Sequence, residues 1–321
     1  MREHLKIHKS SGEVAIRILK NSGAIDHGFS IIRAGEFLLI PLAFVPSAGD
    51  LPGEVVKHEE EPREKRPYPS RISGSYDVIG HIAISKEKDP AKLKELAEGL
   101  LNSGKGIKSV YFDGGVKGDT RIRDLALIAG EDAPVATYRE NGIILKVDVT
   151  RVYFSPRLAT ERLLLSSKVA SGEKIVDMFS GVGSFAINIA SKVDAHITAI
   201  DINAAAVSLM RDNILINRLK GTVEPVLADS TATIREYGNM DRIIMNLPHG
   251  AHSHVRQAMW SLREGGRINY YEICDFEGLE YRLEEFRELG LTVAEKREVH
   301  AYSSRERMYS VELIKGSQAR S

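Results

Sequence analysis

The chain has 321 residues, of which 43% are hydrophobic and 27% charged, which is the composition of a globular protein with room for two or three domains. Lys plus Arg equals Asp plus Glu at 44 each, so the net charge does not predict a nucleic-acid partner, and a local basic patch would have to provide one. The single cysteine excludes an internal disulfide and argues against a cysteine zinc site, and the longest apolar run, at 37–45, is too short to span a bilayer. With no signal peptide visible, we expect a cytoplasmic protein that binds no metal and no membrane.

Residues 1–46 are expected to form a small N-terminal domain. Apolar residues between 14 and 19 follow a helical pattern, and the run 37–40 predicts a strand. A unit of this size is too small to be very stable alone. Residues 47–67 are broken by prolines and dense in charge, so we expect them to be a solvated linker.

Residues 68–152 predict a small α+β middle domain. Apolar runs at 77–84, 109–112 and 142–148 predict strands, and residues 90–101 predict a helix. Strands grouped around a single helix are typical of a small mixed sheet domain.

From residue 153 to 321, strands and helices alternate in the manner of an open parallel sheet. An amphipathic helix is expected over residues 278–290, and a terminal hairpin over 297–313. This part of the chain is therefore expected to be an α/β domain.

The run 172–187 predicts a nucleotide-binding unit. An apolar strand ends in Asp177, a turn with Gly181 and Gly183 follows, and a helical pattern begins at once. A second short strand ends in Asp201. In such a unit the glycines let a ligand approach the backbone closely, and the acid at the second strand tip accepts the ribose hydroxyls.

Two ligands commonly occupy such a unit, a dinucleotide and S-adenosylmethionine. The third glycine position of the dinucleotide pattern carries Ala186, a variant that dinucleotide sites tolerate. Asp177 favours S-adenosylmethionine, because a carboxylate suits its cationic methionine end and would repel a pyrophosphate. Asp229, after a third strand, is placed to accept the adenine amino group. The structural alternative is that Asp177, Asp201 and Asp229 only cap helices or end strands.

The tripeptide Asn246-Leu-Pro248 follows a fourth apolar run at 242–245. The proline favours an extended backbone before it, which would aim the Asn246 amide and a carbonyl at the reactive end of the cofactor. Enzymes that methylate base nitrogens carry similar elements at this point. The alternative is a turn with no chemical role.

Longer motifs carry a family resemblance. The run 148–162 contains Tyr-Phe-Ser-Pro-Arg-Leu and Thr-Glu-Arg, and together with the motifs at 177–183 and 245–248 it resembles the archaeal and eukaryotic tRNA (guanine-37-N1)-methyltransferases. The runs 121–131 and 138–142 also look like the middle domain of that family. The similarity is strong over about residues 70–315 and looser over the first 46. One departure is Phe-Ser-Gly-Val-Gly-Ser at 179–184, where the family usually has Phe-Ala-Gly-Val-Gly-Pro.

The resemblance implies a Rossmann-like class I methyltransferase domain, an α+β middle domain and a small N-terminal domain that docks on tRNA. It implies a monomer that methylates N1 of guanosine 37 in tRNA with S-adenosyl-L-methionine. Glu161 would be the general base, Arg121 would stabilise charge on O6, and Asn246 would orient the base. Without the resemblance, Glu161 and Arg162 would be read as a surface pair on a helix. The implied cofactor-binding residues are Arg162, Asp177, Phe179, Gly181, Gly183, Asp201, Ile202, Asp229, Ser230, Asn246 and Pro248.

Other functions remain as alternatives. A related enzyme of wyosine biosynthesis transfers the aminocarboxypropyl group of the same cofactor, and Pro248 argues against it because its versions of the Asn-Leu element lack the proline. Methylation of a wyosine precursor in addition to guanosine is a second alternative. An NAD-binding oxidoreductase and a nucleic-acid-binding module with a degenerate pocket lie outside this class. His249 and His252 receive no role from the sequence.

Overall fold

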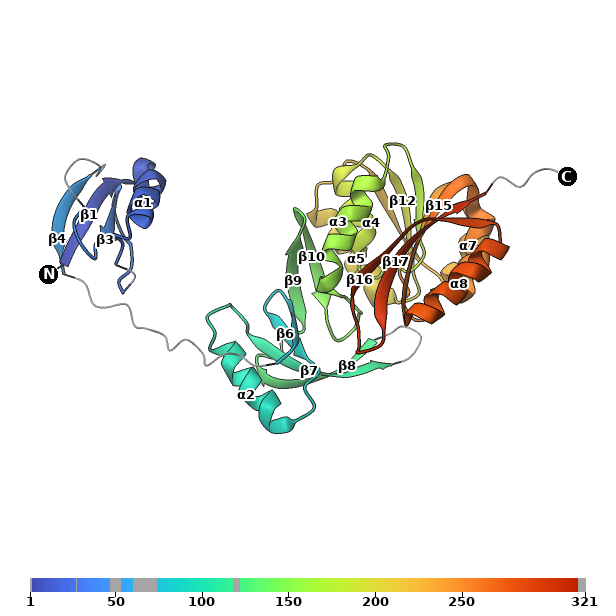
Figure 1. Ribbon diagram of the computed structural model, residues 1–321, viewed down its shortest axis with the longest axis horizontal. Helices are drawn as coiled ribbons and strands as arrows, with labels where there is room; N and C mark the ends of the chain where they lie inside the picture. Colours follow the sequence, from blue (N-terminus) through green and yellow to red (C-terminus); the bar gives the residue numbers. More distant parts are fainter. Residues whose placement is uncertain (1, 27, 47–52, 60–73, 118–121, 317–321) are drawn as a thin grey trace. The chain divides into compact units, whose positions relative to one another are not determined.

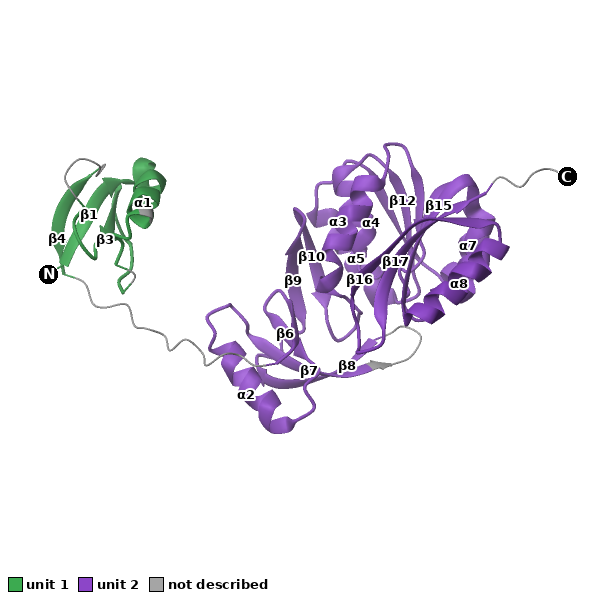
Figure 2. Cartoon of the chain, in the orientation of Figure 1, with its two compact units in different colours: residues 1–71 green, residues 72–321 purple. Residues whose placement is uncertain are grey.

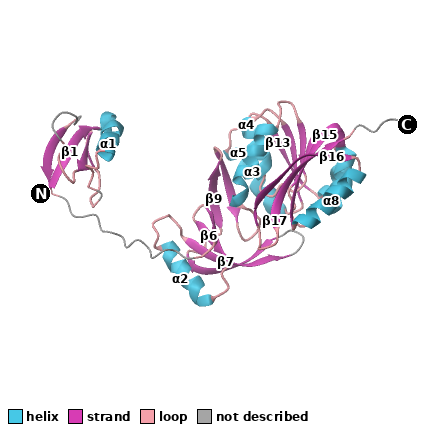
Figure 3. Cartoon of the chain, in the orientation of Figure 1, coloured by secondary structure: helices cyan, strands magenta, loops and turns pink. Residues whose placement is uncertain are grey.

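The computed structural model describes residues 2–26, 28–46, 53–59, 74–117 and 122–316. The chain forms two compact units, residues 1–71 and residues 72–321 (Figure 2). In the second unit, helices and strands alternate from residue 159 to residue 288, and Figure 3 shows the two kinds of element in different colours. Arg121 lies outside the described residues.

The first unit is an antiparallel sheet with one helix, α1 (Gly12–Asn21). Leu5, Leu19 and Ile40 are completely buried in its core. The expected helix and the expected strand at 37–40 are both present. A further strand lies inside the range 47–67, where we expected a linker; its Val56 is opposite His4 of the first strand. The sheet order is β2 (Ile32–Ala34), β3 (Phe37–Pro41), β1 (Arg2–His8) and β4 (Glu54–His58).

The second unit begins with a four-stranded sheet covered by helix α2 (Pro90–Leu101). The helix has the bounds expected from the sequence, because the Asp89 side chain accepts the Ala91 and Lys92 amides and Pro90 occupies the first turn. The strands are β5 (Tyr76–Ile79), β6 (Ile82–Ser85), β7 (Ser109–Lys117) and β8 (Ile122–Gly130).

A hairpin of β9 (Val135–Glu140) and β10 (Ile143–Asp148) packs on helix α5 (Ala204–Ile216) of the following domain. Asn217 and Asn213 pair with the edge of β10 as a neighbouring strand would. The Asn217 amide accepts the Ile144 N–H at 2.9 Å and donates to its carbonyl at 2.7 Å, and Asn213 makes the same two bonds to Lys146.

The main domain contains a seven-stranded sheet in the order β13-β12-β11-β14-β15-β17-β16. The first five strands of this order, from β13 to β15, run parallel to one another, and β17 and β16 each pair antiparallel with the strand before them. This confirms the predicted Rossmann-like α/β fold and the terminal hairpin. The strands are β11 (Lys174–Asp177), β12 (His196–Asp201), β13 (Thr222–Leu227), β14 (Met240–Met245), β15 (Leu262–Cys274), β16 (Leu291–Ala301) and β17 (Arg307–Lys315).

Helices cover both faces of this sheet (Figure 1). Residues of α3 (Ala159–Lys168), α4 (Ser184–Lys192) and α5 share one apolar cluster, and those of α7 (Val255–Ser261) and α8 (Phe276–Glu288) share another. The chain leaves β11 for β12 on one side and returns to β14 on the other. Ligands of open α/β sheets bind at the carboxyl ends of the strands where the order reverses in this way.

Candidate active site

A cavity of about 910 Å³ opens at the carboxyl ends of β11, β12 and β14. One end is lined by residues at the ends of the parallel strands, and the other by residues of the four-stranded sheet, the segment before α3 and strand β16. The first group includes Phe179, Gly181, Asp201, Ile202, Asp229, Ser230, Asn246 and Pro248, and the second Asp77, Lys86, Asp113, Arg123, Arg157 and His300.

The glycine turn after β11 has a backbone that only glycine adopts easily. Gly181 has φ of 55° and Gly183 has φ of 82°, both in the left-handed region. A Cβ on Gly183 would lie 2.7 Å from Cγ of Met210, so the position also lacks space for a side chain. The turn is fastened to β12 because the Gly181 amide donates to the Asp201 carboxylate at 2.7 Å. The expected glycine turn and acidic strand tip therefore act as one structural unit.

Asp177 ends β11 directly beneath this turn and is 1% exposed. Its carboxylate oxygens have no hydrogen-bond partner among the described residues. Burial and the nearby Asp201 charge raise the pKa of Asp177 to about 8, and the Phe179 amide opposes this rise. A cationic ligand group nearby would favour the ionised form. Asp177 does not itself line the cavity, whereas the next residues along the chain do.

Asp201 and Asp229 line the cavity and also cap backbone groups. Asp201 accepts the amides of Gly181 and Asn203, and burial raises its pKa against these bonds. Asp229 caps the short helix α6 (Ser230–Thr233), and its bond from the Thr231 hydroxyl is the main cause of its lowered pKa. A carboxylate has about four acceptor sites, so capping leaves each acid able to bind a ligand donor.

Asn246 lines the cavity after β14, and its buried Oδ1 accepts no hydrogen bond from the described part of the chain. A ligand donor would satisfy this acceptor, whose burial without one is costly. The turn that holds Asn246 is fixed from behind, because the Pro248 carbonyl accepts the Ile273 amide at 2.9 Å.

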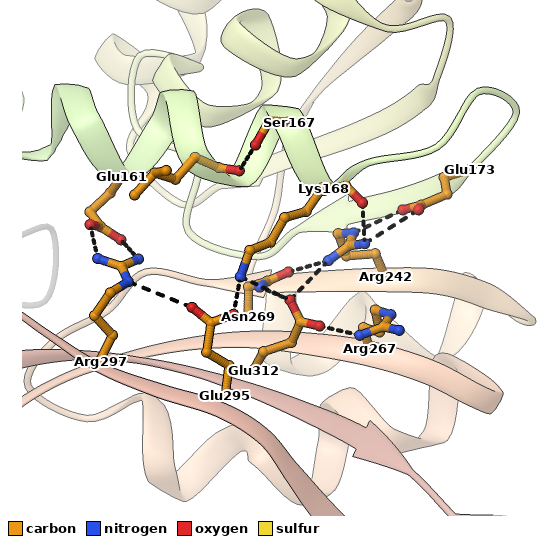
Figure 4. A network of polar contacts seen from close by, with 11 residues as sticks. Glu161, Ser167, Lys168, Glu173, Arg242, Arg267, Asn269, Glu295, Arg297 and Glu312 are labelled. Carbon is orange, nitrogen blue, oxygen red and sulfur yellow. Dashed lines mark hydrogen bonds and ion pairs between the residues drawn. The ribbon is translucent and has the colours of Figure 1, made fainter.

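Glu161 and Arg162 are neighbours in the first turn of α3, but their side chains have different partners. Arg162 lines the cavity and is 1% exposed, and its guanidinium binds both oxygens of Glu140 at 2.6 and 2.5 Å and the Ser155 carbonyl. Glu161 is 3% exposed and does not line the cavity. Both of its oxygens accept hydrogen bonds from Arg297 of β16, at 2.5 and 2.7 Å (Figure 4). The surface pair that a local reading would give is therefore absent: both side chains are buried, and each pairs with a distant residue.

A charged cluster that was not expected from the sequence lies at the second end of the cavity. Arg123 donates to Asp113 at 3.2 Å and to the Phe154 carbonyl at 3.1 Å, and Arg157 donates to Asp77 at 2.7 Å. The motif at 121–131 contains Arg123, so the sequence did hold a signal for this residue. No sequence signal indicates that Arg157 pairs with Asp77, which lies 80 positions away in the chain.

The structure also places two histidines that the sequence left unassigned. His249 lines the cavity, and its ring centre lies 5.7 Å from that of Tyr302, a second lining residue. Nδ1 of His252 lies 3.6 Å from the Glu272 carboxylate. Within the described ranges, no group of three or more His, Cys, Asp or Glu side chains could hold a metal ion, and no helix is long and apolar enough to cross a membrane.

Comparison with known proteins identifies the family. Residues 136–313, more than half of the chain, match the model of the TRM5/TYW2 methyltransferase domain. The chain belongs to the TRM5/TYW2 methyltransferase family. Its residues 5–46 match the tRNA methyltransferase 5 N-terminal domain, and residues 64–133 match the TYW2 N-terminal domain. The resemblance seen in the sequence motifs is thus confirmed.

Two relatives named Trm5b match almost the whole chain. The tRNA (guanine(37)-N(1))-methyltransferase Trm5b of Pyrococcus abyssi is 39% identical, with 94% of this chain and 96% of the relative covered. The Trm5b of Methanocaldococcus jannaschii is 36% identical, with 96% and 97% covered. The crystal structure of P. abyssi Trm5b has a TM-score of 0.68 at 36% identity, covering 98% of this chain and 99% of the other. The complex of aTrm5 with tRNALeu has a TM-score of 0.70 at 34% identity and the same coverage.

Relatives of the TYW2 type match less of the chain. The tRNA(Phe) (4-demethylwyosine(37)-C(7)) aminocarboxypropyltransferase of Pyrococcus horikoshii is 30% identical, with 52% of this chain and 59% of the relative covered.

Proposed function

We propose that this protein transfers the methyl group of S-adenosyl-L-methionine to N1 of guanosine at position 37 of tRNA. The observation that carries the proposal is the similarity to two Trm5b enzymes over nearly the full length of both chains. Similarity to an aminocarboxypropyltransferase of the wyosine pathway extends over only 52% of this chain, and Pro248 separates the sequence from the versions of that enzyme known to us.

The cavity has the donor and acceptor groups that this cofactor needs. Asp201 would accept the ribose hydroxyls, Asp229 the adenine amino group, and Asp177 would favour the cationic methionine end from beneath the glycine turn. The backbone of Gly181 admits a ligand closely because no side chain stands there. When bound, S-adenosylmethionine supplies a methyl carbon whose bond to the sulfonium breaks with the electron pair passing to sulfur. Arg162 is proposed to support the cofactor end of the cavity. Its guanidinium donates to the Ser155 carbonyl and so holds that segment in place.

The acceptor nitrogen must lose a proton before it attacks. N1 of guanine carries a hydrogen and its lone pair is delocalised, so it is a poor nucleophile until a base removes that proton. We propose that Glu161 takes the N1 proton as the N1–carbon bond forms. Negative charge then develops on O6, and Arg121 is proposed to stabilise it. Asn246 would orient the base through its free amide oxygen.

The second end of the cavity is the proposed entrance for the nucleotide. Lys86, Arg123 and Arg157 line it together with Asp77 and Asp113, which pair with the two arginines, and these side chains offer donors to a phosphate or to the edge of a base. The base has to leave its stack to enter a cavity of this depth, which favours a loop nucleotide over one in a duplex. We propose that residues 1–46 dock on the tRNA as a separate recognition domain and that the enzyme acts as a monomer.

The transferred group is the sharpest test of this proposal. The enzyme is incubated with unmodified tRNA and S-adenosylmethionine labelled only in its methyl group. We expect labelled 1-methylguanosine and unlabelled S-adenosylhomocysteine. Label retained in methylthioadenosine, with the amino-acid portion of the cofactor added to tRNA, would show the aminocarboxypropyl reaction and contradict the proposal.

A further inference from the structure

Arg297 of β16 binds Glu161 through a two-point contact that no local sequence pattern predicts. Nη1 and Nη2 donate to the two carboxylate oxygens at 2.5 and 2.7 Å, in the fork geometry that gives the strongest Arg–carboxylate pairs (Figure 4). The two residues are 136 positions apart in the chain. Glu161 is buried, whereas the Arg297 side chain remains one-third exposed.

The Arg297 guanidinium also contacts a second carboxylate, on the side away from Glu161 in Figure 4. Its Nε lies 3.7 Å from Glu295, which in turn accepts from Lys168 of α3. Lys168 continues the network to Glu312 of β17 at 3.7 Å, as Figure 4 shows. The bond to Glu161 is the main cause of the raised pKa of Arg297. The guanidinium is therefore a fixed positive charge between α3 and the terminal hairpin.

A buried carboxyl group without such a cation tends to hold a proton. Asp177 shows this within the same domain, since burial and the Asp201 charge raise its pKa to about 8. A general base must instead be ionised before it can accept a proton. Glu161 is 3% exposed, and a buried carboxylate is costly without a paired charge, which Arg297 provides.

We propose that Arg297 is a positioning residue for methyl transfer, which pairs with the buried carboxylate of Glu161 and fixes its direction. This inference rests on the proposed role of Glu161 as the base. The fork contact occupies two of the roughly four acceptor sites of the carboxylate, which leaves sites for the proton of guanine N1. That proton moves from N1 to a Glu161 oxygen, and Arg297 gives up no proton. Arg297 acts on the chemical step through Glu161 and contributes little to binding.

The test compares single-turnover rates at saturating enzyme and cofactor. Arg297→Met removes the charge and is expected to lower the rate roughly 10²-fold, the lower end of what a general base contributes, with tRNA and cofactor affinities unchanged. Arg297→Lys retains a charge without the fork and should restore part of the rate. Arg307→Met is the matched control, because Arg307 lies on the same hairpin, is similarly exposed and pairs with Glu298 at 3.3 Å. It should keep the wild-type rate.

A double-mutant cycle with Glu161→Gln separates positioning from general support of the fold. If Arg297 acts through Glu161, then adding Arg297→Met to Glu161→Gln lowers the rate no further. The double variant leaves no unpaired buried charge, so we expect it to fold even if Arg297→Met alone does not, and the comparison with Glu161→Gln and with Arg297→Lys still decides the matter. Losses that simply add would overturn the inference.

The cycle also distinguishes this inference from the proposed function. A Glu161→Gln variant with a much reduced rate, beside Arg297→Met at the wild-type rate, would overturn only the role of Arg297. A Glu161→Gln variant at the wild-type rate would overturn the role of Glu161 as base and the inference that depends on it.

Discussion

Asp177 and Glu161 are two buried carboxylates of one domain that have different surroundings. Asp177 is buried without a cation and with no hydrogen-bond partner among the described residues, and its pKa rises to about 8. Glu161 is also buried but is paired with Arg297. Burial disfavours the charged form of a carboxyl group and a nearby opposite charge favours it, so the two sites differ in the presence of the Arg297 guanidinium beside Glu161.

The raised pKa of Asp177 predicts a pH dependence of stability. Its folded-state pKa of about 8 lies above the ordinary value of 3.8, so folding favours the protonated form. The stability that this contributes is complete below about pH 4 and is lost as the pH rises toward 8. Asp177→Asn cannot ionise, so its unfolding midpoint without ligand should fall less than that of the wild type between pH 5 and pH 8. Thermal unfolding at several pH values measures this, and parallel curves for the two proteins would refute it.

At the scale of elements, the turn between β11 and α4 combines two constraints on one residue. Gly183 has a left-handed backbone, and its missing side chain leaves room for Met210 of α5. The turn therefore also fixes how α4 and α5 pack. A substitution there should disturb both the cofactor end of the cavity and the helix layer behind it.

Gly183→Ala is expected to destabilise the protein more than Gly142→Ala. The two glycines have φ of 82° and 85°, so the backbone strain is similar, about 1–3 kcal/mol each. A Cβ at Gly142 would meet nothing within 4 Å, whereas at Gly183 it would meet Met210 at 2.7 Å. The difference in unfolding free energy between the two variants, from denaturant titration, measures the packing cost. Equal losses of unfolding free energy in the two variants would mean that Met210 moves aside at no energetic cost.

Local sequence signals predicted the elements that have local causes. The helix at 90–101 has its proline in the first turn, and the glycine turn with Asp177 and Asp201 follows the expected strand and turn order. Strand β4 was missed because its five residues lie in a charged, proline-broken stretch and are held by pairing with β1. Its cause lies in another part of the chain.

For the candidate site, the residues at strand ends could be predicted from the sequence, and the long-range partners of buried charges could not. Residues that follow strand ends, such as Asp201, Asp229 and Asn246, meet at one cavity because parallel strands end at one edge of a sheet. The partners of Glu161 and Arg162 could not be inferred, because Arg297 and Glu140 reach them from other strands. No pattern at the first turn of α3 indicates which distant charge completes a buried pair.

At the scale of the whole molecule, the chain separates into a small unit and a large one that contains the entire described cavity. The small unit has its own sheet, helix and apolar core. Its residues 5–46 match the tRNA methyltransferase 5 N-terminal domain. An independent unit tethered to a catalytic one raises the local concentration of the site it recognises.

Removal of residues 1–71 is therefore expected to weaken tRNA binding and discrimination between intact and misfolded tRNA. Affinity for S-adenosylmethionine should stay within about twofold of the full chain, because no described lining residue is removed. The deletion takes out the whole unit, including β4, so that no unpaired strand edge remains. Calorimetric titration with the cofactor and binding assays with both forms of tRNA measure the two effects. Loss of cofactor affinity would show that the small unit belongs to the catalytic core.

The central claim is that the protein methylates N1 of guanosine 37. The most direct measurement is mass analysis of nucleosides and fragments from two tRNA transcripts treated with the enzyme and S-adenosylmethionine, one with guanosine and one with adenosine at position 37. We expect 1-methylguanosine in the fragment that contains position 37 of the first transcript and no methylation of the second. Methylation at another position, on another guanine atom, or equally in both transcripts would contradict it.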